Sequence, residues 1–329
     1  MTEMPLVSVI LPVYNMAQKL PRCVESLMRQ TYPKMEFLFV DDGSTDESAL
    51  VLSRYAEKDA RIRVIAKENG GVSSARNEGM RQMRGEYATF VDPDDTVSAE
   101  YVRLLLEALQ TQGTKLSCCR IRVIPEAEAD KAVSEETTHE PAKRTTLADY
   151  DQWGAMAHVQ CYGAMYHRSL LTKLRFDESI RYAEDTLFYM QALLLAGSVM
   201  YLPEKLYYYV EWNGSALRRP YTPAQYSDVT VWAEICRMTR DVSPRLYQSS
   251  QTKYAFACTR AFYYSLTSRE DCEGIRRDAV RRLRKNWRAV LKMPDAAKHE
   301  RRKALLAMCC PRAAKHLWHR AKAEEGAGQ

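Results

Sequence analysis

Residues 87–96 read Tyr87-Ala88-Thr89-Phe90-Val91-Asp92-Pro93-Asp94-Asp95-Thr96, so three carboxylates follow directly on an apolar run. Pro93 restricts the backbone and keeps Asp92 extended, which holds the carboxylates at the end of the run. Three like charges at this spacing predict a cation. Oxygen ligands suit Mg²⁺ or Mn²⁺, which commonly share their coordination shell with substrate phosphates. A turn or cap accounts for Asp95 or Thr96, but not for all three carboxylates.

The segments around this stretch alternate between strand and helix patterns. Strands are expected at residues 6–11, 36–40, 61–66 and 86–91. Three helices are expected between these strands. The first is indicated by apolar residues that recur at helical spacing from Leu20 onward, and the second by the capping-box pattern of Ser44 and Glu47. The third is expected at residues 73–84. This order predicts an α/β fold of the Rossmann-like type, a mostly parallel sheet flanked by helices.

Polar clusters follow each of these strands, at residues 12–15, 41–42, 69–71 and 92–95. Because ligands bind beyond the carboxyl ends of parallel strands, the four clusters are expected to converge on one cleft. Asp41 and Asp42 fit either turn chemistry or hydrogen bonding to a nucleotide base or ribose. Asn69, Gly70 and Arg76 fit either a simple turn or an anion site at a helix start. Neither a P-loop nor a G-x-G-x-x-G fingerprint is present.

The later sequence is less regular. Strands are expected at 116–124, 161–168, 199–202 and 206–210, and helices at 98–113 and 184–195. Residues 125–146 predict a long exposed loop, with order returning at 150–157, and the pattern is helical from residue 221 onward. We therefore expect a first half at 1–115, a second half of the same domain at 116–220, and a basic helical region at 221–329.

The composition is that of an ordinary globular protein, with 329 residues, 46% hydrophobic residues and a net charge of +6. No apolar stretch approaches the roughly 20 residues that span a bilayer, and no secretory leader is evident, so a cytosolic protein is expected. The nine cysteines include no C-x-x-C pair and predict reduced core thiols.

Residues 276–322 carry 16 Lys or Arg and three acids, so positive charge is concentrated near the C-terminus. Val280, Leu283, Trp287, Val290 and Leu291 fall on one face of a helix, surrounded by basic residues. This pattern fits a helix packed on the catalytic domain or an interfacial helix on an anionic membrane surface. Nucleic-acid binding is disfavoured because the rest of the chain is acidic.

Four segments closely resemble, in order, the motifs of bacterial-type family 2 inverting glycosyltransferases with the GT-A fold. They are Pro12-Val13-Tyr14-Asn15, residues 40–46, Asn69-Gly70-Gly71 leading to Arg76, and Phe90-Val91-Asp92-Pro93-Asp94-Asp95. The resemblance covers residues 5–215 and implies that residues 1–115 are the nucleotide-sugar-binding half and residues 116–220 the acceptor half of one domain. It includes Tyr182-Ala183-Glu184-Asp185, similar to the family's Glu-Asp motif. Pro93 stands where the family commonly has Ser. The Gln-x-x-Arg-Trp motif of processive members is missing.

The resemblance implies a role for each matching residue. Asp185 would be the general base, and Asp94 with Asp92 the DxD motif holding Mn²⁺ or Mg²⁺. Glu184 would support its neighbour on the acceptor side, where Trp212 could stack on an acceptor sugar. The residues implied in donor binding are Pro12, Tyr14, Asn15, Asp41, Asp42, Asn69, Gly70, Arg76 and Asp92. The implied donor is a UDP-hexose or UDP-N-acetylhexosamine, and the implied acceptor a glycan or a lipid-linked glycan of a cell-surface polysaccharide.

Other classes of protein share parts of this pattern. Asp92-x-Asp94-x-Thr96 also matches the nucleophile motif of haloacid-dehalogenase-like phosphohydrolases. That motif belongs near a first strand and needs a later Gly-Asp pair, whereas here it ends the fourth strand and no such pair follows. A non-catalytic protein that binds sugar nucleotides is a further alternative, although both Asp94 and Asp185 are present.

Overall fold

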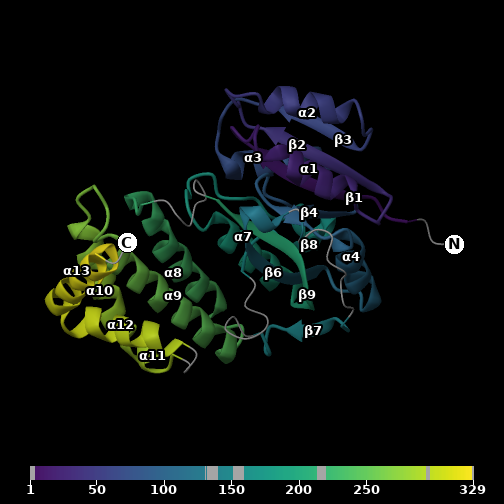
Figure 1. The fold of residues 1–329 in the computed structure, drawn as a ribbon. Coiled ribbons are helices and arrows are strands. Elements are labelled where there is room, and N and C mark those ends of the chain that lie inside the picture. The colour runs from purple at the N-terminus through teal and green to yellow at the C-terminus, as the bar shows by residue number, and fades with distance from the viewer. Residues whose placement is uncertain are drawn as a thin grey trace. The chain divides into compact units, whose positions relative to one another are not determined.

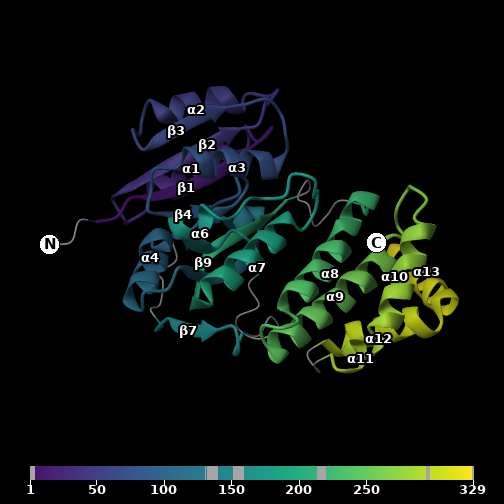
Figure 2. The same ribbon diagram turned by 180° about the vertical axis from the view of Figure 1, so that it is seen from behind.

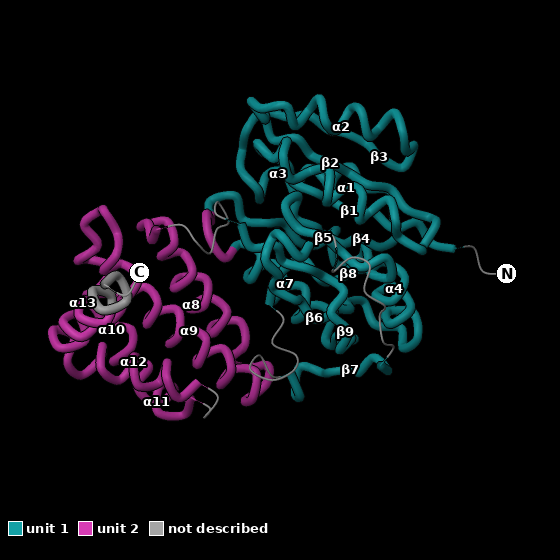
Figure 3. The backbone as a smooth tube through the Cα atoms, in the orientation of Figure 1, with its two compact units in different colours: residues 1–179, 184–215 teal, residues 180–183, 216–329 magenta. Residues whose placement is uncertain are grey.

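The computed structural model describes residues 4–129, 131, 140–150, 159–212, 220–293 and 297–327. The chain forms two compact units (Figure 3). Unit 1 comprises Met1–Ser179 and Glu184–Ser215, and unit 2 comprises Ile180–Ala183 and Ala216–Gln329. The Asn213-Gly214-Ser215 stretch that follows Trp212 and most of the expected ordered segment at 150–157 lie outside the described residues.

Unit 1 is built on a nine-stranded sheet with the order β3-β2-β1-β4-β8-β6-β9-β5, and β7 pairs with β9 (Figure 1). The strands are β1 (Val7–Val13), β2 (Met35–Asp41), β3 (Ile62–Ala66), β4 (Tyr87–Phe90), β5 (Thr96–Val97), β6 (Leu116–Pro125), β7 (Lys143–Thr146), β8 (Ala164–His167) and β9 (Ser198–Glu211). The first four strands are parallel, as the strand–helix alternation predicted. Beyond β4 the pairing is mixed, because β8 is antiparallel to both β4 and β6.

Helices cover both faces of this sheet. Alternate residues of β1 and β2, among them Val9 and Phe37, share one core with helices α1 (Leu20–Met28), α2 (Ser48–Ala56) and α4 (Tyr101–Thr111). On the other face lie α3 (Val72–Gln82) and α7 (Glu184–Ala196). Gly79 of α3 sits so close to β1 that a Cβ there would lie 2.3 Å from Cγ2 of Ile10. This close approach fixes α3 behind the strands that carry the site. The predicted α/β fold class is confirmed.

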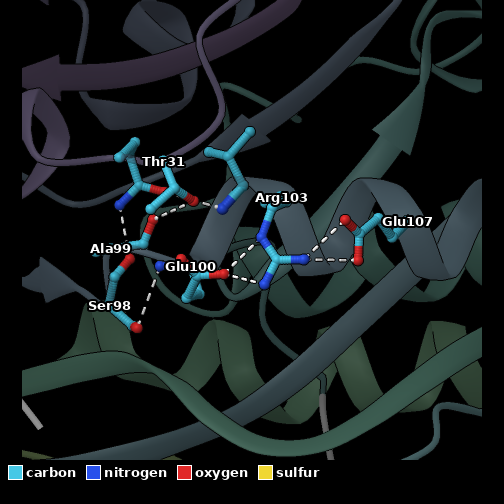
Figure 4. Close-up of polar contacts among 8 residues, drawn as sticks. Thr31, Ser98, Ala99, Glu100, Arg103 and Glu107 are labelled. Atoms are coloured by element: carbon cyan, nitrogen blue, oxygen red, sulfur yellow. Dashed lines mark hydrogen bonds and ion pairs between the residues drawn. The ribbon is translucent and has the colours of Figure 1, made fainter. Parts of the chain in front are cut away.

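The start of α4 shows how a helix is anchored beside the carboxylate stretch (Figure 4). Ser98 lies before the helix, and its hydroxyl accepts a hydrogen bond from the Glu100 amide at 3.3 Å. Gln30 reaches across from the end of α1 and accepts from the Val102 amide at 3.0 Å. On the exposed side, Arg103 pairs with Glu100 and with Glu107. Side chains outside the helix therefore satisfy donors of its first turn.

Several local predictions were wrong in detail. Residues 199–202 and 206–210 form one strand, β9, and the expected loop at 125–146 includes β7 and a short 3-10 helix, Glu126–Glu128. The capping box at Ser44 and Glu47 is absent because α2 begins at Ser48. Instead, Asp46 accepts from the Ser48 amide at 2.9 Å and the Ser44 hydroxyl accepts from the Asn15 amide at 3.0 Å. These side chains satisfy backbone donors of the loop after β1 as well as the helix start.

Unit 2 is helical in its described residues (Figure 2). A 3-10 turn, Pro223–Tyr226, leads into α8 (Ser227–Thr239), α9 (Pro244–Tyr264), α10 (Glu273–Lys285), α11 (Trp287–Leu291), α12 (Lys298–Cys309) and α13 (Pro311–Ala327). Helices α8 and α9 lie side by side in both views, and α10 packs on α9. Of the helices within the described ranges, none is both long and apolar enough to cross a membrane.

The apolar face expected from Val280 to Leu291 is divided. The helix is interrupted at Asn286, which ends α10 and precedes α11. Val280, Leu283 and Val290 are buried in unit 2, whereas Trp287 and Leu291 are exposed. One part of the expected face therefore packs within unit 2 and the other faces solvent, and membrane docking of this segment stays a prediction.

Candidate active site

The parallel register brings the expected site residues to one edge of the sheet. Val13 pairs with Asp41, and Asp41 pairs with Ala66 on the next strand. On the other side of β1, Ile10 pairs with Phe90, so the segment that begins at Val91 leaves the sheet at the same edge. The four polar clusters follow these strand ends.

The three carboxylates of the opening stretch have different surroundings. Asp92 keeps part of its side chain exposed, and its Oδ1 accepts from Arg76 at 2.9 Å. Asp94 accepts from the indole N–H of Trp212 at 3.0 Å. Burial raises the pKa of the Asp94 carboxyl, and the negative charge of Asp92 raises it further. Asp94 thus carries a charge that its protein neighbours compensate only in part.

Asp95 is buried and belongs to the framework of the turn. It accepts from the Tyr207 hydroxyl at 2.7 Å and from the Val210 amide at 2.9 Å. The same hydroxyl accepts from the Asp92 amide at 3.1 Å, so Tyr207 ties the carboxylate turn to β9. Burial, followed by the charges of Asp94 and Asp92, raises the pKa of Asp95 well above its usual value. This geometry agrees with the expectation that Asp95 serves the turn.

Arg76 joins the carboxylate turn to the Glu-Asp segment. The arginine comes from α3, is 3% exposed, and donates through one terminal nitrogen to Asp92 and through the other to Glu184 at 2.8 Å. Burial opposes the charged form of Arg76, but the surrounding acidic groups still raise its pKa. Two carboxylates from distant segments are therefore held by one planar, permanently charged group.

Asp185 follows Glu184 at the start of α7 and is half-buried. Its Oδ1 accepts from the Thr186 amide at 2.7 Å. Burial raises the pKa of Asp185 to about 7, the charge of Glu184 adds to the rise, and Arg76 opposes it. A carboxylate with a pKa near neutrality can take up a proton during a reaction at physiological pH.

The residues at this edge fit a divalent ion that shares its shell with a diphosphate. Across the described ranges, no three side chains among His, Cys, Asp and Glu form a ready-made metal-binding group. Asp92 and Asp94 nevertheless supply oxygen ligands where negative charge is in excess, which suits Mg²⁺ or Mn²⁺ held partly by substrate phosphates.

The Asp41–Asp42 pair shapes the loops beside the site. Asp41 accepts from the Ser44 amide at 3.0 Å, which is turn chemistry. Asp42 is buried, and its two carboxylate oxygens accept from the amides of Gly70 at 3.0 Å and Gly71 at 2.7 Å, and from Lys67 at 2.6 Å. The Asn69 side chain donates to the Asp42 carbonyl at 2.9 Å. These contacts fix the loop whose Gly71 has a φ of +90°, a conformation that favours glycine.

The polar cluster at residues 12–15 also contributes mainly to the structure of the loops beside the site. Pro12 is buried within β1, whereas Tyr14 is 47% exposed at the strand's end. Asn15 adopts a left-handed conformation with a φ of 53°, and its side-chain oxygen accepts from the Thr45 amide at 2.8 Å. Tyr14 is thus the large exposed side chain of this cluster, while Asn15 organises the neighbouring loop.

Sequence reasoning missed three side chains that hold the site together. Tyr207 falls within the expected strand at 206–210 and was not singled out, yet its hydroxyl joins Asp92 and Asp95. Lys67 binds Asp42, and Lys19 lies 4.8 Å from the centre of the Trp212 ring. Lys67 could have been suspected because it directly follows a predicted strand. The other two depend on contacts between segments about 110 or more residues apart.

This arrangement of strand-end acids on a mixed sheet is that of the GT-A class of glycosyltransferases, whose solved members share the fold. The profile of Glycosyl transferase family 2 matches residues 8–175, and the chain belongs to this family. The resemblance noted from the motifs is therefore confirmed.

Two relatives and two solved structures illustrate the match. The Bacillus subtilis protein named uncharacterized glycosyltransferase EpsJ is 40% identical over 231 residues, covering 67% of this chain and 65% of EpsJ. Streptococcus pneumoniae glycosyltransferase GlyA is 32% identical over 219 residues, 64% of this chain and 31% of GlyA. The match thus spans less than two thirds of either relative.

The Staphylococcus aureus TarS 1–349 structure in complex with UDP-GlcNAc has a TM-score of 0.68 at 21% identity, covering 96% of this chain and 92% of that one. The Pyrobaculum calidifontis mannosyltransferase PcManGT, in complex with GDP-Man and Mn²⁺, has a TM-score of 0.51 at 18% identity, covering 97% and 85%. At these identities the likeness shows the fold.

Proposed function

We propose that the chain transfers a sugar, with inversion, from a UDP-hexose or UDP-N-acetylhexosamine to a hydroxyl of a glycan or lipid-linked acceptor. The observation that carries the proposal is the Arg76 bridge, which holds Asp92 and Glu184 on one guanidinium and thereby brings Asp185 close to the DxD carboxylates. Carboxylates that can hold a divalent ion for the diphosphate, and a base with a pKa near 7, are the two features that such a transfer needs.

In this mechanism Asp185 takes the proton of the acceptor hydroxyl as that oxygen attacks the anomeric carbon and the nucleoside diphosphate leaves from the opposite face. Glu184 keeps Asp185 in place by anchoring the start of α7 to Arg76. Asp92 and Asp94 would hold a Mn²⁺ or Mg²⁺ ion, which stabilises negative charge on a departing diphosphate. The indole of Trp212 orients Asp94 through its hydrogen bond.

The comparisons support this choice of donor and metal. The TarS structure is a complex with UDP-GlcNAc, and the PcManGT structure is a complex with GDP-Man and Mn²⁺. The Staphylococcus aureus TarS sequence, 28% identical over 207 residues, is named a poly(ribitol-phosphate) beta-N-acetylglucosaminyltransferase. A role in the synthesis of a bacterial cell-surface polymer is therefore part of the proposal.

The donor is expected to lie along the strand ends of residues 1–115, and the acceptor against residues 116–220. Tyr14 supplies an exposed ring for the base, and Pro12, Asn15, Asp41, Asp42, Asn69 and Gly70 form or support the loops around it. Arg76 and Asp92 would stand at the phosphates. Trp212 donates to Asp94 and Lys19 Nζ lies over one face of its ring, so an acceptor sugar would stack on the opposite face.

We also propose that the protein acts in the cytoplasm, at the inner face of the cell membrane. Trp287 and Leu291 are exposed on α11 next to the basic residues Arg288 and Lys292. An exposed apolar pair with flanking cations is the composition of an interfacial segment on anionic lipid. Such docking would bring the enzyme to a lipid-linked acceptor.

A donor screen tests the catalytic proposal. The protein is incubated with Mn²⁺ and a panel of nucleotide sugars, and products are read by mass; slow hydrolysis of one UDP-sugar is expected. Asp94→Ala should abolish this hydrolysis. Asp185→Asn should lower transfer by roughly 10²–10⁴-fold while leaving binding of UDP with Mn²⁺ intact. Asp241→Asn removes an exposed carboxylate of unit 2 and is the control.

Two outcomes would contradict the proposal. Hydrolysis of simple phosphomonoesters without nucleotide binding would indicate the phosphohydrolase alternative, with Asp92 as the nucleophile. Nucleotide-sugar binding that survives both substitutions, with no turnover by the wild-type protein, would indicate a binding protein without catalysis.

A further inference from the structure

Unit 2 contains a concave site that the catalytic proposal does not use. Residues of α9, α10 and α13, the helices labelled in Figure 1, line a cavity of about 800 Å³. Phe262, Val280 and Pro311 supply its apolar part. Seven cationic side chains and a single acid, Glu273, supply the rest of the lining; the cations are Arg276, Arg277, Arg281, Arg284, Lys285, Arg312 and Lys315. We call this cavity the cationic groove.

Most of the charge in the cationic groove is available to a ligand. All of its cations except Arg276 are exposed side chains. Among the contacts of the described residues, Arg277 pairs with Glu273 at 3.6 Å and Arg281 with Asp278, whereas no acidic partner is recorded for Lys285, Arg312 or Lys315. Concentrating like charges in a concavity raises the electrostatic free energy of the protein, and an anionic ligand relieves it.

The spacing of the cations distinguishes one phosphate from several. Helix α10 contributes cations from residue 276 to residue 285, and nine residues of α-helix rise about 14 Å. A single phosphate group is too small to contact the full length of such a row. A linear chain with repeated phosphates could follow α10 and reach Arg312 and Lys315 on α13.

The lining also separates a phosphate-bearing glycan from a nucleic acid. Single-stranded nucleic acids are held by aromatic side chains on which the bases stack. Among the residues that line the groove in the described ranges, Phe262 is the aromatic one, and it is 3% exposed. The groove therefore offers charge and a narrow apolar wall, but no stacking platform.

From these observations we infer that the cationic groove is an accessory binding site for the phosphates of a linear anionic acceptor, a polymer whose repeats are joined by phosphodiesters. The inference rests on the proposed transferase function, since it assigns the acceptor class. It agrees with the name of the relative TarS, which denotes a poly(ribitol-phosphate) substrate. Binding of the polymer in unit 2 would raise its effective concentration for the catalytic unit.

The test compares two charge-matched variants of the full chain. Lys285→Glu/Arg312→Glu/Lys315→Glu removes three lining cations, whereas Arg240→Glu/Arg269→Glu/Arg302→Glu makes the same change in charge at exposed residues of unit 2 outside the lining. Binding of short inorganic polyphosphate and of synthetic poly(glycerol phosphate) is measured by calorimetry. Circular dichroism verifies that both variants are folded.

The groove variant is expected to bind both polymers at least tenfold more weakly than the wild type, and the control variant within about twofold. If three phosphates are contacted, a fourfold rise in salt should weaken wild-type binding by roughly 20-fold, following the slope of about −0.7 per contact found for single strands. With a phosphodiester acceptor, the groove variant should raise KM and leave kcat and donor hydrolysis unchanged.

Each other outcome overturns the inference. Equal weakening in both variants would mean that net charge, and not the groove, attracts the polymer. Tighter binding of a single-stranded oligonucleotide of equal charge would assign the groove to nucleic acid. Loss of binding to phosphatidylglycerol vesicles without loss of polymer binding would assign it to the membrane. Because polymer binding is measured without donor, an inactive protein that still binds through the groove would contradict the transferase proposal alone.

Discussion

The two units of the chain use charged side chains in opposite ways. In unit 1, Arg76 is 3% exposed and binds two carboxylates. In unit 2, arginines such as Arg281 lie at the surface, and their partner Asp278 responds differently from Asp185. Partial burial raises the pKa of Asp278, but hydrogen bonds from Tyr226 and Arg282 lower it well below its usual range. Asp185 has few hydrogen-bond donors and can act as a base, whereas Asp278 has several donors and stays ionised.

The sharpest way to break this contrast is to remove the bridging arginine of unit 1. Arg76→Met should lower the free energy of unfolding by about 3–5 kcal/mol, because Asp92 and Glu184 would remain partly buried without their counter-charge. The free energy of unfolding of Arg76→Lys should lie between those of Arg76→Met and the wild type, since an ammonium group lacks the planar fork of donors that binds both carboxylates. Urea unfolding measures both differences.

The same experiment has a clear opposing outcome. If Arg76→Met unfolds at the wild-type urea concentration, the two carboxylates have relaxed into solvent, and the bridge does not define the site. The variant should also lose binding of UDP with Mn²⁺, because Asp92 is then no longer held at the strand end.

The next largest effect is expected at Tyr207. Tyr207→Phe deletes the hydroxyl that donates to Asp95 and accepts from the Asp92 amide, so two buried polar groups lose a partner. The expected cost is about 1–3 kcal/mol of unfolding free energy. Tyr264→Phe in unit 2, where the side chain is 48% exposed, should cost far less. Equal thermal shifts for the two variants would place Tyr207 among ordinary packing residues.

The fold was largely predictable because its signals are local. Apolar runs ended by Pro12, Asp41 and Asp92 mark the parallel strands, and helical spacing marks the segments between them. The antiparallel position of β8 between β4 and β6 was not predictable, because strand order depends on packing between distant segments. The end of one helix and the start of another at Asn286 were also missed. A single helix was expected across this position, which placed Trp287 and Leu283 on one face, but Trp287 is exposed and Leu283 is buried.

The candidate site was predictable as a set of residues but not as a network. The acids at Asp92, Asp94 and Asp185 were found because their residue types suit the chemistry and their motifs occur in order. The Arg76–Glu184 pair spans more than a hundred residues, and nothing local indicates it. Arg76 was expected at a phosphate, yet it binds two carboxylates; its role toward the diphosphate stays a prediction.

The pH dependence of transfer tests the raised pKa of Asp185. A base must be deprotonated, so kcat/KM should fall about tenfold per pH unit below pH 7 and level off above it. The raised pKa also means that the folded state favours the protonated carboxyl. The free energy of unfolding should therefore fall as pH rises from the ordinary carboxyl pKa to about 7 and level off above it, and Asp185→Asn should remove that fall. Asp278→Asn should leave the activity profile unchanged, and a profile flat from pH 5 to 9 would rule out Asp185 as the base.

The smallest effect on stability is expected for an exposed ion pair of unit 2, which is the opposite case to the buried Arg76 bridge of unit 1. Arg237 and Glu234 lie three residues apart on α8, with the arginine side chain 69% exposed. Arg237→Ala should leave the urea midpoint of unfolding nearly unchanged, because water already solvates both charges and salt screens them. Repeating Arg237→Ala and Arg76→Met in high salt sharpens the comparison, since screening should erase the first effect and leave most of the second. A larger loss for Arg237→Ala than for Arg76→Met would reverse the comparison, because the exposed pair would then contribute more to stability than the buried bridge.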